Sequence, residues 1–255
     1  MHQKPDQTRK GIQLDYRELK TISNVLLTGS TGYLGCNILN QLLNLTSYNV
    51  FLLIRAPSSE EAFNRINNKF KFYFNKALDD IQNPRLFIYP GDIEKIDLGL
   101  SAEHYHKLAN IIDSTIHCAA LVKHYGEYDK FYLANVQSTI NLLEFTKLTK
   151  IKDFHHISTY SILNFADTPN HKAYVYTEDD LPESLEKSYN VYVQTKFNAE
   201  QEVTKYRNFG INANIYRLGN LAFISDNYRA QENIKENAFL NWLHCLLKIR
   251  CIAED

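Results

Sequence analysis

Short apolar runs alternate along the chain with longer stretches in which apolar residues recur every three or four positions. A continuous apolar run is typical of a strand buried on both faces, and the longer period is typical of a helix with one buried side. The runs predict strands at 25–28, 49–54, 86–89, 114–118, 154–157 and 212–216. Helical patterns include 101–110, 127–150, 190–209 and 237–250, and one that begins at 34.

Strands that alternate with helices predict a doubly wound α/β fold, in which a parallel sheet carries helices on both faces. This alternation extends over residues 22–225, which we expect to form one large domain. Residues 1–21 are polar and mixed in charge, so they predict a tail or linker. The pattern changes after residue 225, and residues 226–255 with their apolar helix predict the beginning of a second, smaller part.

Composition excludes several classes of function. Of 255 residues, 44% are hydrophobic and 22% charged, which is an ordinary globular balance. The net charge of −1 gives no reason to expect binding to nucleic acid. No apolar run approaches the roughly 18 residues that span a bilayer, so we expect no membrane segment and a cytoplasmic protein. The four cysteines lack metal-ligand spacing, so no metal site is predicted.

A glycine-rich turn links the first strand to the first helix. Residues 28–35 read Thr-Gly-Ser-Thr-Gly-Tyr-Leu-Gly. Gly29 can adopt backbone angles closed to other residues, Gly32 lets a ligand approach the backbone, and Gly35 allows close helix packing. The following helix start offers free N–H groups to a pyrophosphate. The pattern favours a dinucleotide site, although a glycine turn without a ligand is the alternative.

Arg55 stands at the carboxyl end of the second predicted strand. An acidic residue there binds the ribose 2′-hydroxyl of NAD, whereas arginine accommodates the 2′-phosphate of NADP. Arg55 therefore predicts NADP(H), and Arg65 on the next helix could lie near the same phosphate. A solvated arginine at the end of a strand is the alternative.

Further residues stand at the ends of the third and fourth strands. Asp92 could accept a hydrogen bond from the adenine amino group, or it could simply form a turn. Ala119 and Ala120 are small enough to let the nicotinamide ribose approach the backbone. Asn135, inside the 127–150 helix, either ties that helix to the site or is exposed.

The catalytic candidates are Thr159, Tyr192 and Lys196. Chance alone produces about one Tyr-x-x-x-Lys pair in a chain of this composition, and the sequence holds a second at Tyr16 and Lys20. Only Tyr192 and Lys196 follow the Ser158-Thr159 strand end, where parallel sheets bind ligands. A lysine ammonium would lower the high pKa of the phenol, and Thr159 would donate to the same substrate oxygen. The pair thus predicts reduction of a carbonyl.

Together, residues 28–35, Gly-Asp-Ile at 91–93, Ser-Thr at 158–159 and Tyr-Val-Gln-Thr-Lys at 192–196 resemble the extended short-chain dehydrogenase/reductases. The segments 52–56, 215–221 and 231–239 are most similar to thioester reductase domains, which terminate nonribosomal peptide synthetases and carboxylic acid reductases. The resemblance covers residues 23–250.

This resemblance implies a Rossmann sheet and NADPH-dependent release of an acyl or peptidyl thioester as an aldehyde, or further as an alcohol. The thioester would arrive on the phosphopantetheine of a carrier protein, within a larger multidomain synthetase. Residues 22–225 would be the NADP-binding domain with the catalytic residues, and 226–255 the start of a substrate-binding subdomain, here truncated. By matching position it assigns cofactor contacts to Gly29, Ser30, Thr31, Gly32, Tyr33, Leu34, Gly35, Arg55, Arg65, Asp92, Ile93, Ala119, Ala120, Tyr192, Lys196, Leu218 and Asn220.

Three points stay open at this level. The acyl group and the choice between Ser158 and Thr159 are not fixed by the motifs, although superfamily alignment favours Thr159. A nucleotide-sugar epimerase or dehydratase is an alternative, and it would favour an acidic residue where Arg55 stands. A dinucleotide sensor or scaffold without activity is another, but such proteins often lack the tyrosine–lysine pair.

Overall fold

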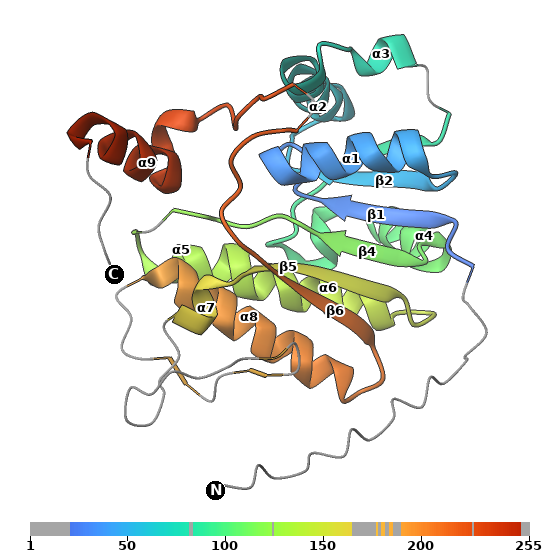
Figure 1. The fold of residues 1–255 in the computed structure, drawn as a ribbon. Helices are drawn as coiled ribbons and strands as arrows, with labels where there is room; N and C mark the ends of the chain where they lie inside the picture. Colours follow the sequence, from blue (N-terminus) through green and yellow to red (C-terminus); the bar gives the residue numbers. More distant parts are fainter. Residues whose placement is uncertain are drawn as a thin grey trace, which may run out of the picture.

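A sheet between two layers of helices forms the molecule (Figure 1). The computed structural model describes residues 21–81, 84–123, 125–164, 190–225 and 227–250, and five single residues between 177 and 185. The expected tail at 1–21, apart from Thr21, lies outside the described residues.

The sheet has six parallel strands in the order β3-β2-β1-β4-β5-β6. The strands are β1 (Asn24–Thr28), β2 (Asn49–Ile54), β3 (Leu86–Pro90), β4 (Ser114–His117), β5 (Asp153–Thr159) and β6 (Asn212–Leu218). The direction of winding reverses between β1 and β4. In doubly wound folds, ligands bind beyond the carboxyl ends of the strands at this reversal.

Helices cover both faces of the sheet (Figure 1). Helices α1 and α2 lie on one face, and α4, α6 and α8 lie on the other. The helical segments are α1 (Tyr33–Leu45), α2 (Ser59–Phe74), α3 (Leu78–Ile81), η1 (Ile96–Gly99), α4 (Ala102–Ile111), α5 (Tyr128–Phe131), η2 (Tyr132–Gln137), α6 (Ser138–Lys147), α7 (Ser161–Asn164), α8 (Val191–Arg207), η4 (Ile234–Glu236) and α9 (Ala238–Ile249).

Neighbouring residues of the central strands belong to different halves of the core. Leu26 and Phe51 pack with Leu142 of α6, whereas Leu27 and Val50 belong to the cluster formed with α1 and α2. Successive side chains of a strand point to opposite faces, so a strand buried on both faces needs an unbroken apolar run. This is why the central strands could be located from the sequence, and the doubly wound fold is confirmed.

The segment expected as one helix over 127–150 consists of three consecutive parts. An α-helical turn (α5) is followed by a π-helical turn (η2) and then by α6, which ends at Lys147. A π turn holds one more residue than an α turn, and such turns are frequent at functional sites. The prediction of a single regular helix is therefore wrong in its middle.

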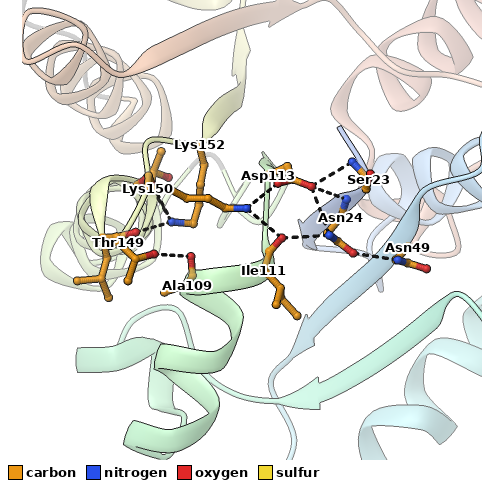
Figure 2. A network of polar contacts seen from close by, with 11 residues as sticks. Ser23, Asn24, Asn49, Ala109, Ile111, Asp113, Thr149, Lys150 and Lys152 are labelled. Atoms are coloured by element: carbon orange, nitrogen blue, oxygen red, sulfur yellow. Dashed lines mark hydrogen bonds and ion pairs between the residues drawn. The ribbon is translucent and has the colours of Figure 1, made fainter. Parts of the chain in front are cut away.

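A polar network closes the amino edge of the sheet, opposite the carboxyl ends of the strands (Figure 2). The Asp113 carboxylate accepts hydrogen bonds from the backbone N–H groups of Ser23 (3.0 Å) and Asn24 (2.9 Å). The Lys150 ammonium lies 2.7 Å from the other carboxylate oxygen. Burial alone would raise the pKa of Asp113, but these hydrogen bonds outweigh it and lower that pKa.

Helix α9 follows the sheet domain and presents large apolar side chains to the surface. Trp242, Leu247 and Ile249 are each more than half exposed. In the part of the chain that the structure describes, no helix combines the length and the apolar character that crossing a membrane requires.

Candidate active site

The glycine turn has the geometry that its sequence predicts. Gly29 has a φ of +73°, and a Cβ on it would lie 2.5 Å from the backbone nitrogen of Ala119. A Cβ on Gly35 would lie 2.2 Å from the Gly29 carbonyl oxygen. A Cβ on Gly32, by contrast, meets just that oxygen, at 3.3 Å, and otherwise open space. Two glycines therefore serve packing, and Gly32 leaves room for a ligand.

A groove of about 490 Å³ begins at this turn and follows the carboxyl ends of β1, β2, β3 and β4. Helix α1 points its amino end toward it, and Gly32, the capping residue, supplies no side-chain hydrogen bond. The first N–H groups of a helix attract an anion when no side chain caps them. The predicted residues that line the groove are Gly29, Ser30, Thr31, Gly32, Arg55, Arg65, Asp92, Ile93, Ala119 and Ala120.

Other predicted cofactor residues do not line this groove. Tyr33 and Leu34 face a separate hollow of about 260 Å³, and the Tyr33 hydroxyl donates to the Arg229 carbonyl over 3.3 Å. Gly35 packs against Gly29. Leu218 and Asn220 also lie outside the groove lining, as do Tyr192 and Lys196. Of residues 33 and 34, therefore, the backbone N–H groups could contribute to anion binding, but the side chains could not.

Arg55 lies at the groove but has a carboxylate beside it. Its Nη1 atom is 3.2 Å from Oε1 of Glu94, and its side chain is 67% exposed. The Arg65 guanidinium donates to the Arg55 backbone carbonyl. The Arg55 and Arg65 side chains therefore lie close together at the groove, as expected from the sequence. Glu94, which sequence reasoning did not single out, adds a negative charge to the same end of the groove.

Asp92 lines the groove and also stabilises its own turn, because its Oδ1 atom accepts a hydrogen bond from the Glu94 backbone N–H (3.1 Å). The two alternatives left open by the sequence are thus compatible. A turn residue at the end of β3 can still present its second carboxylate oxygen to a ligand.

Thr159 and Tyr192 lie together at the end of β5. Their side chains form a hydrogen bond, and the Thr159 Oγ1 atom also accepts the Ser161 N–H at 3.2 Å. Asn190 caps α8 by accepting hydrogen bonds from the backbone N–H groups of Tyr192 and Val193, which fixes the helix start beside β5. The hydroxyl that contacts Tyr192 therefore belongs to Thr159.

Lys196 lies fully buried one helical turn beyond Tyr192. Its ammonium donates to the Ile157 carbonyl (2.7 Å) and contacts the His156 Nε2 atom (3.0 Å). Burial lowers the pKa of Lys196 to about 8, although the nearby carboxylate of Glu200 acts in the opposite direction.

The expected effect of Lys196 on the phenol is not what the structure shows. Burial raises the pKa of Tyr192, and the hydrogen bond with Thr159 offsets part of this increase. Lys196 makes its hydrogen bonds with β5 instead. Tyr192 is therefore a protonated phenol near neutral pH, and it can act as a hydrogen-bond and proton donor.

Asn135 in the π-helical turn connects the site to its surroundings. Its Oδ1 atom accepts from the Leu121 N–H (2.7 Å), and its Nδ2 atom donates to the Leu121 carbonyl (3.1 Å) and to the Thr195 hydroxyl (3.0 Å). Of the two alternatives, the buried, tethering Asn135 is confirmed. It holds the segment after β4 against α8.

A buried ion pair near Lys196 was not predicted from the sequence. Glu200 is fully buried and forms an ion pair with Arg217 of β6, with 2.8 Å between the Glu200 Oε2 and Arg217 Nη2 atoms. Glu200 follows Lys196 by four residues, so helical spacing was a usable signal. Within the described ranges, no group of three or more His, Cys, Asp or Glu side chains could hold a metal ion.

The strand order, the three-glycine turn and the groove at the winding reversal define a dinucleotide-binding domain of the Rossmann type. A profile of the Male sterility protein family, whose domains bind nicotinamide dinucleotides, matches residues 27–248. The chain belongs to this family.

Similar proteins are large. A linear gramicidin synthase protein of Brevibacillus parabrevis is 33% identical over 208 residues, which cover 82% of this chain and 4% of that protein. L-2-aminoadipate reductase of Saccharomyces cerevisiae is 33% identical over 228 residues, 85% of this chain and 16% of that protein. The solved thiolation-reductase di-domain of an archaeal non-ribosomal peptide synthetase is 31% identical, with a TM-score of 0.77, 90% of this chain covered and 60% of that one. The chain thus spans a small part of these curated relatives.

Proposed function

We propose that the protein reduces a carrier-bound acyl or peptidyl thioester to an aldehyde with NADPH, and so releases it. The contact between Thr159 and Tyr192, at the carboxyl edge of the sheet and with Lys196 buried beside it, is the observation that carries this proposal. The relatives support the reaction class, because they include an aminoadipate reductase and a thiolation-reductase di-domain. A solved UDP-glucuronic acid 4-epimerase of Bacillus cereus is also similar, but its TM-score of 0.57 is lower than the 0.77 of the thiolation-reductase di-domain, so the epimerase alternative is less well supported.

The groove residues fit a dinucleotide. We assign the pyrophosphate to the glycine turn and the amino end of α1, because the position that Gly32 leaves open adjoins uncapped N–H groups. Arg55 and Arg65 would hold the 2′-phosphate that distinguishes NADPH from NADH. Asp92 and Ile93 would flank the adenine, and Ala119 and Ala120 would lie along the nicotinamide ribose.

When bound, the cofactor supplies the hydride that adds to the thioester carbonyl. Thr159 and Tyr192 donate hydrogen bonds to the carbonyl oxygen, where negative charge develops, and hold the tetrahedral species until the thiol departs. Tyr192, protonated at neutral pH, can supply from its phenol oxygen the one proton that the departing sulfur takes up, so that the products are the aldehyde and the free thiol. Lys196, with a pKa of about 8, is mostly charged at pH 7 and favours the phenolate that results.

The thioester would reach the site on a phosphopantetheine-bearing carrier domain of the same synthetase, as the thiolation-reductase di-domain suggests. Residues 226–255 would begin a substrate-binding subdomain. The exposed apolar side chains of α9, including Trp242, are consistent with further packing there.

Consumption of NADPH, followed at 340 nm with an acyl-pantetheine thioester, tests the proposal. Tyr192→Phe should abolish turnover, because the mutation removes a hydroxyl that touches the reacting oxygen. Tyr48→Phe, at the opposite edge of the sheet before β2, is the matched control and should behave as wild type. Turnover by Tyr192→Phe at the wild-type rate would refute the proposed chemistry. Analysis of the product distinguishes aldehyde from alcohol.

The choice of cofactor has its own measurement. Arg55→Ala should weaken NADPH binding and leave NADH binding unchanged, since only NADPH carries the 2′-phosphate. A wild-type preference for NADH would instead favour the epimerase alternative.

A further inference from the structure

His156, on β5, lies directly against Lys196. The distance between the Lys196 Nζ and His156 Nε2 atoms is 3.0 Å, and both side chains are almost completely buried. The Ile157 carbonyl oxygen is the second acceptor of the same ammonium, at 2.7 Å. Two neighbouring positions of one strand thus hold the lysine.

The contact fixes the form of the imidazole. A lysine ammonium can only donate hydrogen bonds, so the Nε2 atom of His156 must accept, and the ring hydrogen must be on Nδ1. Burial lowers the pKa of His156 well below its usual value, with Lys196 and His117 adding to this effect. His156 is therefore neutral at pH 7, and it accepts a hydrogen bond from Lys196 without repelling its charge.

The Nδ1 atom of His156 finds no hydrogen-bond partner among the described groups. A buried polar group without a partner is costly, so an apolar residue would be expected here if the ring served packing alone. The neighbouring His117 shows the contrast, because Thr28 and Thr139 contact its two ring nitrogens at 2.8 and 3.2 Å.

Groups from several elements face Lys196. The Glu200 carboxylate of α8 favours its charge and also pairs with Arg217 of β6. Cys118 after β4, whose pKa burial raises to about 12, is a neutral thiol near pH 7, and His117 of β4 and His156 of β5 are neutral as well. Among these groups, His156 and the Ile157 backbone provide the hydrogen bonds that orient the ammonium.

We propose that His156 is a positioning residue: with the Ile157 carbonyl it holds two N–H groups of Lys196 and leaves the third for the cofactor ribose and Tyr192. An ammonium has three donors, and within the described structure two of them have acceptors. The purpose assigned to the third donor rests on the proposed function. The contact with His156 itself does not.

Two variants and a control isolate the contact. His156→Phe keeps an aromatic ring and removes the acceptor, whereas His156→Gln keeps an acceptor oxygen. His155→Phe is the control, because His155 is the adjacent residue on the opposite face of β5 and contacts Tyr216 instead. The titration of Lys196 is followed by NMR on protein with ¹³C-labelled lysine, with Lys196→Arg identifying the signal.

Loss of a hydrogen bond to a charged group should lower the apparent pKa of Lys196 by about one unit in His156→Phe. Wild type and His155→Phe should titrate near pH 8, and His156→Gln should lie close to them. In turnover, the alkaline limb of the pH profile should move downward by the same amount in His156→Phe. An unchanged titration in folded His156→Phe, or a Gln variant that behaves like Phe, would overturn the proposal.

Wild-type protein provides a test that no variant can spoil by unfolding. The ¹⁵N shifts of His156 should show the hydrogen on Nδ1 from pH 5 to 8, and a hydrogen on Nε2 would overturn the assignment. Absence of thioester reduction in wild type would count against the proposed function alone, because both NMR measurements need no substrate.

Discussion

Gly32 and Gly35 stand three residues apart, yet alanine at each should have a different effect. In the structure, Gly32 has φ −84° and ψ 169°, which alanine adopts without strain. Alanine restricts the unfolded chain, a gain of about 0.4–1 kcal/mol, and caps a helix less well than glycine, a loss of similar size. The free energy of unfolding of Gly32→Ala should therefore stay within about 1 kcal/mol of wild type.

Cofactor binding should respond to Gly32→Ala instead. The new methyl group would occupy the open space next to the uncapped amino end of α1. Displacing a phosphate from there removes one or two hydrogen bonds to a charged group, each worth about 1.5–3 kcal/mol. The dissociation constant of NADPH should rise by about tenfold to more than a hundredfold.

Gly35→Ala should act on the fold. Its Cβ would lie 2.2 Å from the Gly29 carbonyl oxygen and 2.7 Å from the Gly29 carbonyl carbon, so α1 must move away from β1. Overpacking of this kind costs about 1–3 kcal/mol, which corresponds to a fall in Tm of roughly 2–12 °C.

Thermal unfolding and fluorescence titration with NADPH, measured on both variants, check this pair. Gly32→Ala should unfold like wild type and bind weakly, and Gly35→Ala should unfold earlier. NADPH bound by Gly32→Ala as tightly as by wild type would refute the assignment of this position to ligand approach. Wild-type stability in Gly35→Ala would refute the packing argument.

Two further predictions concern charges. Glu94→Gln should strengthen NADPH binding by up to about fivefold and leave NADH binding unchanged, because it removes a carboxylate that pairs with the exposed Arg55 side chain. Parallel fluorescence titrations measure both affinities. Asp113→Asn should lower the free energy of unfolding at pH 7 by about 1–2 kcal/mol in urea denaturation, a modest value because Lys150 is partly exposed.

The pH dependence of Asp113→Asn follows from the lowered pKa of Asp113. A carboxyl whose pKa is lower in the folded state stabilises the protein above its ordinary pKa near 4, and this contribution is lost as pH falls through the folded value. The gap between wild type and variant should thus be full at pH 7 and close below about pH 4. A gap that widened with acid would contradict this reasoning. The Glu94→Gln prediction would be contradicted if the affinities for NADPH and NADH rose by the same factor.

The glycine turn and the strand ends could be predicted because each depends on few neighbours. Gly29 and Gly32 act through the backbone, because the first has a positive φ and the second leaves open space where a side chain would be. An apolar run such as 49–54 fits a strand buried on both faces. Position along the chain also selected Tyr192 over Tyr16, since a parallel sheet gathers its strand ends at one edge.

What could not be predicted depends on contacts between distant segments. The π turn adds one residue to a helix without changing its apolar pattern, and the tethering of Asn135 to Leu121 and Thr195 is tertiary. Likewise, spacing suggested that Lys196 would serve Tyr192, but His156, forty positions earlier, receives one of its hydrogen bonds. The spacing of Tyr192 and Lys196 predicted a lowered pKa for Tyr192, whereas its burial raises that pKa.

The network at the amino edge bears on how the protein can be attached to other molecules. The Asp113 carboxylate accepts hydrogen bonds from the backbone N–H groups of Ser23 and Asn24, where the chain enters β1 (Figure 2). The five residues of β1 place this entry roughly 17 Å from the glycine turn. A surface linker or a force probe coupled before Ser23 would first load the hydrogen bonds between Asp113 and the backbone of Ser23 and Asn24. The groove at the carboxyl ends of the strands lies away from this attachment point, which makes this end of the domain a suitable anchor for immobilised assays.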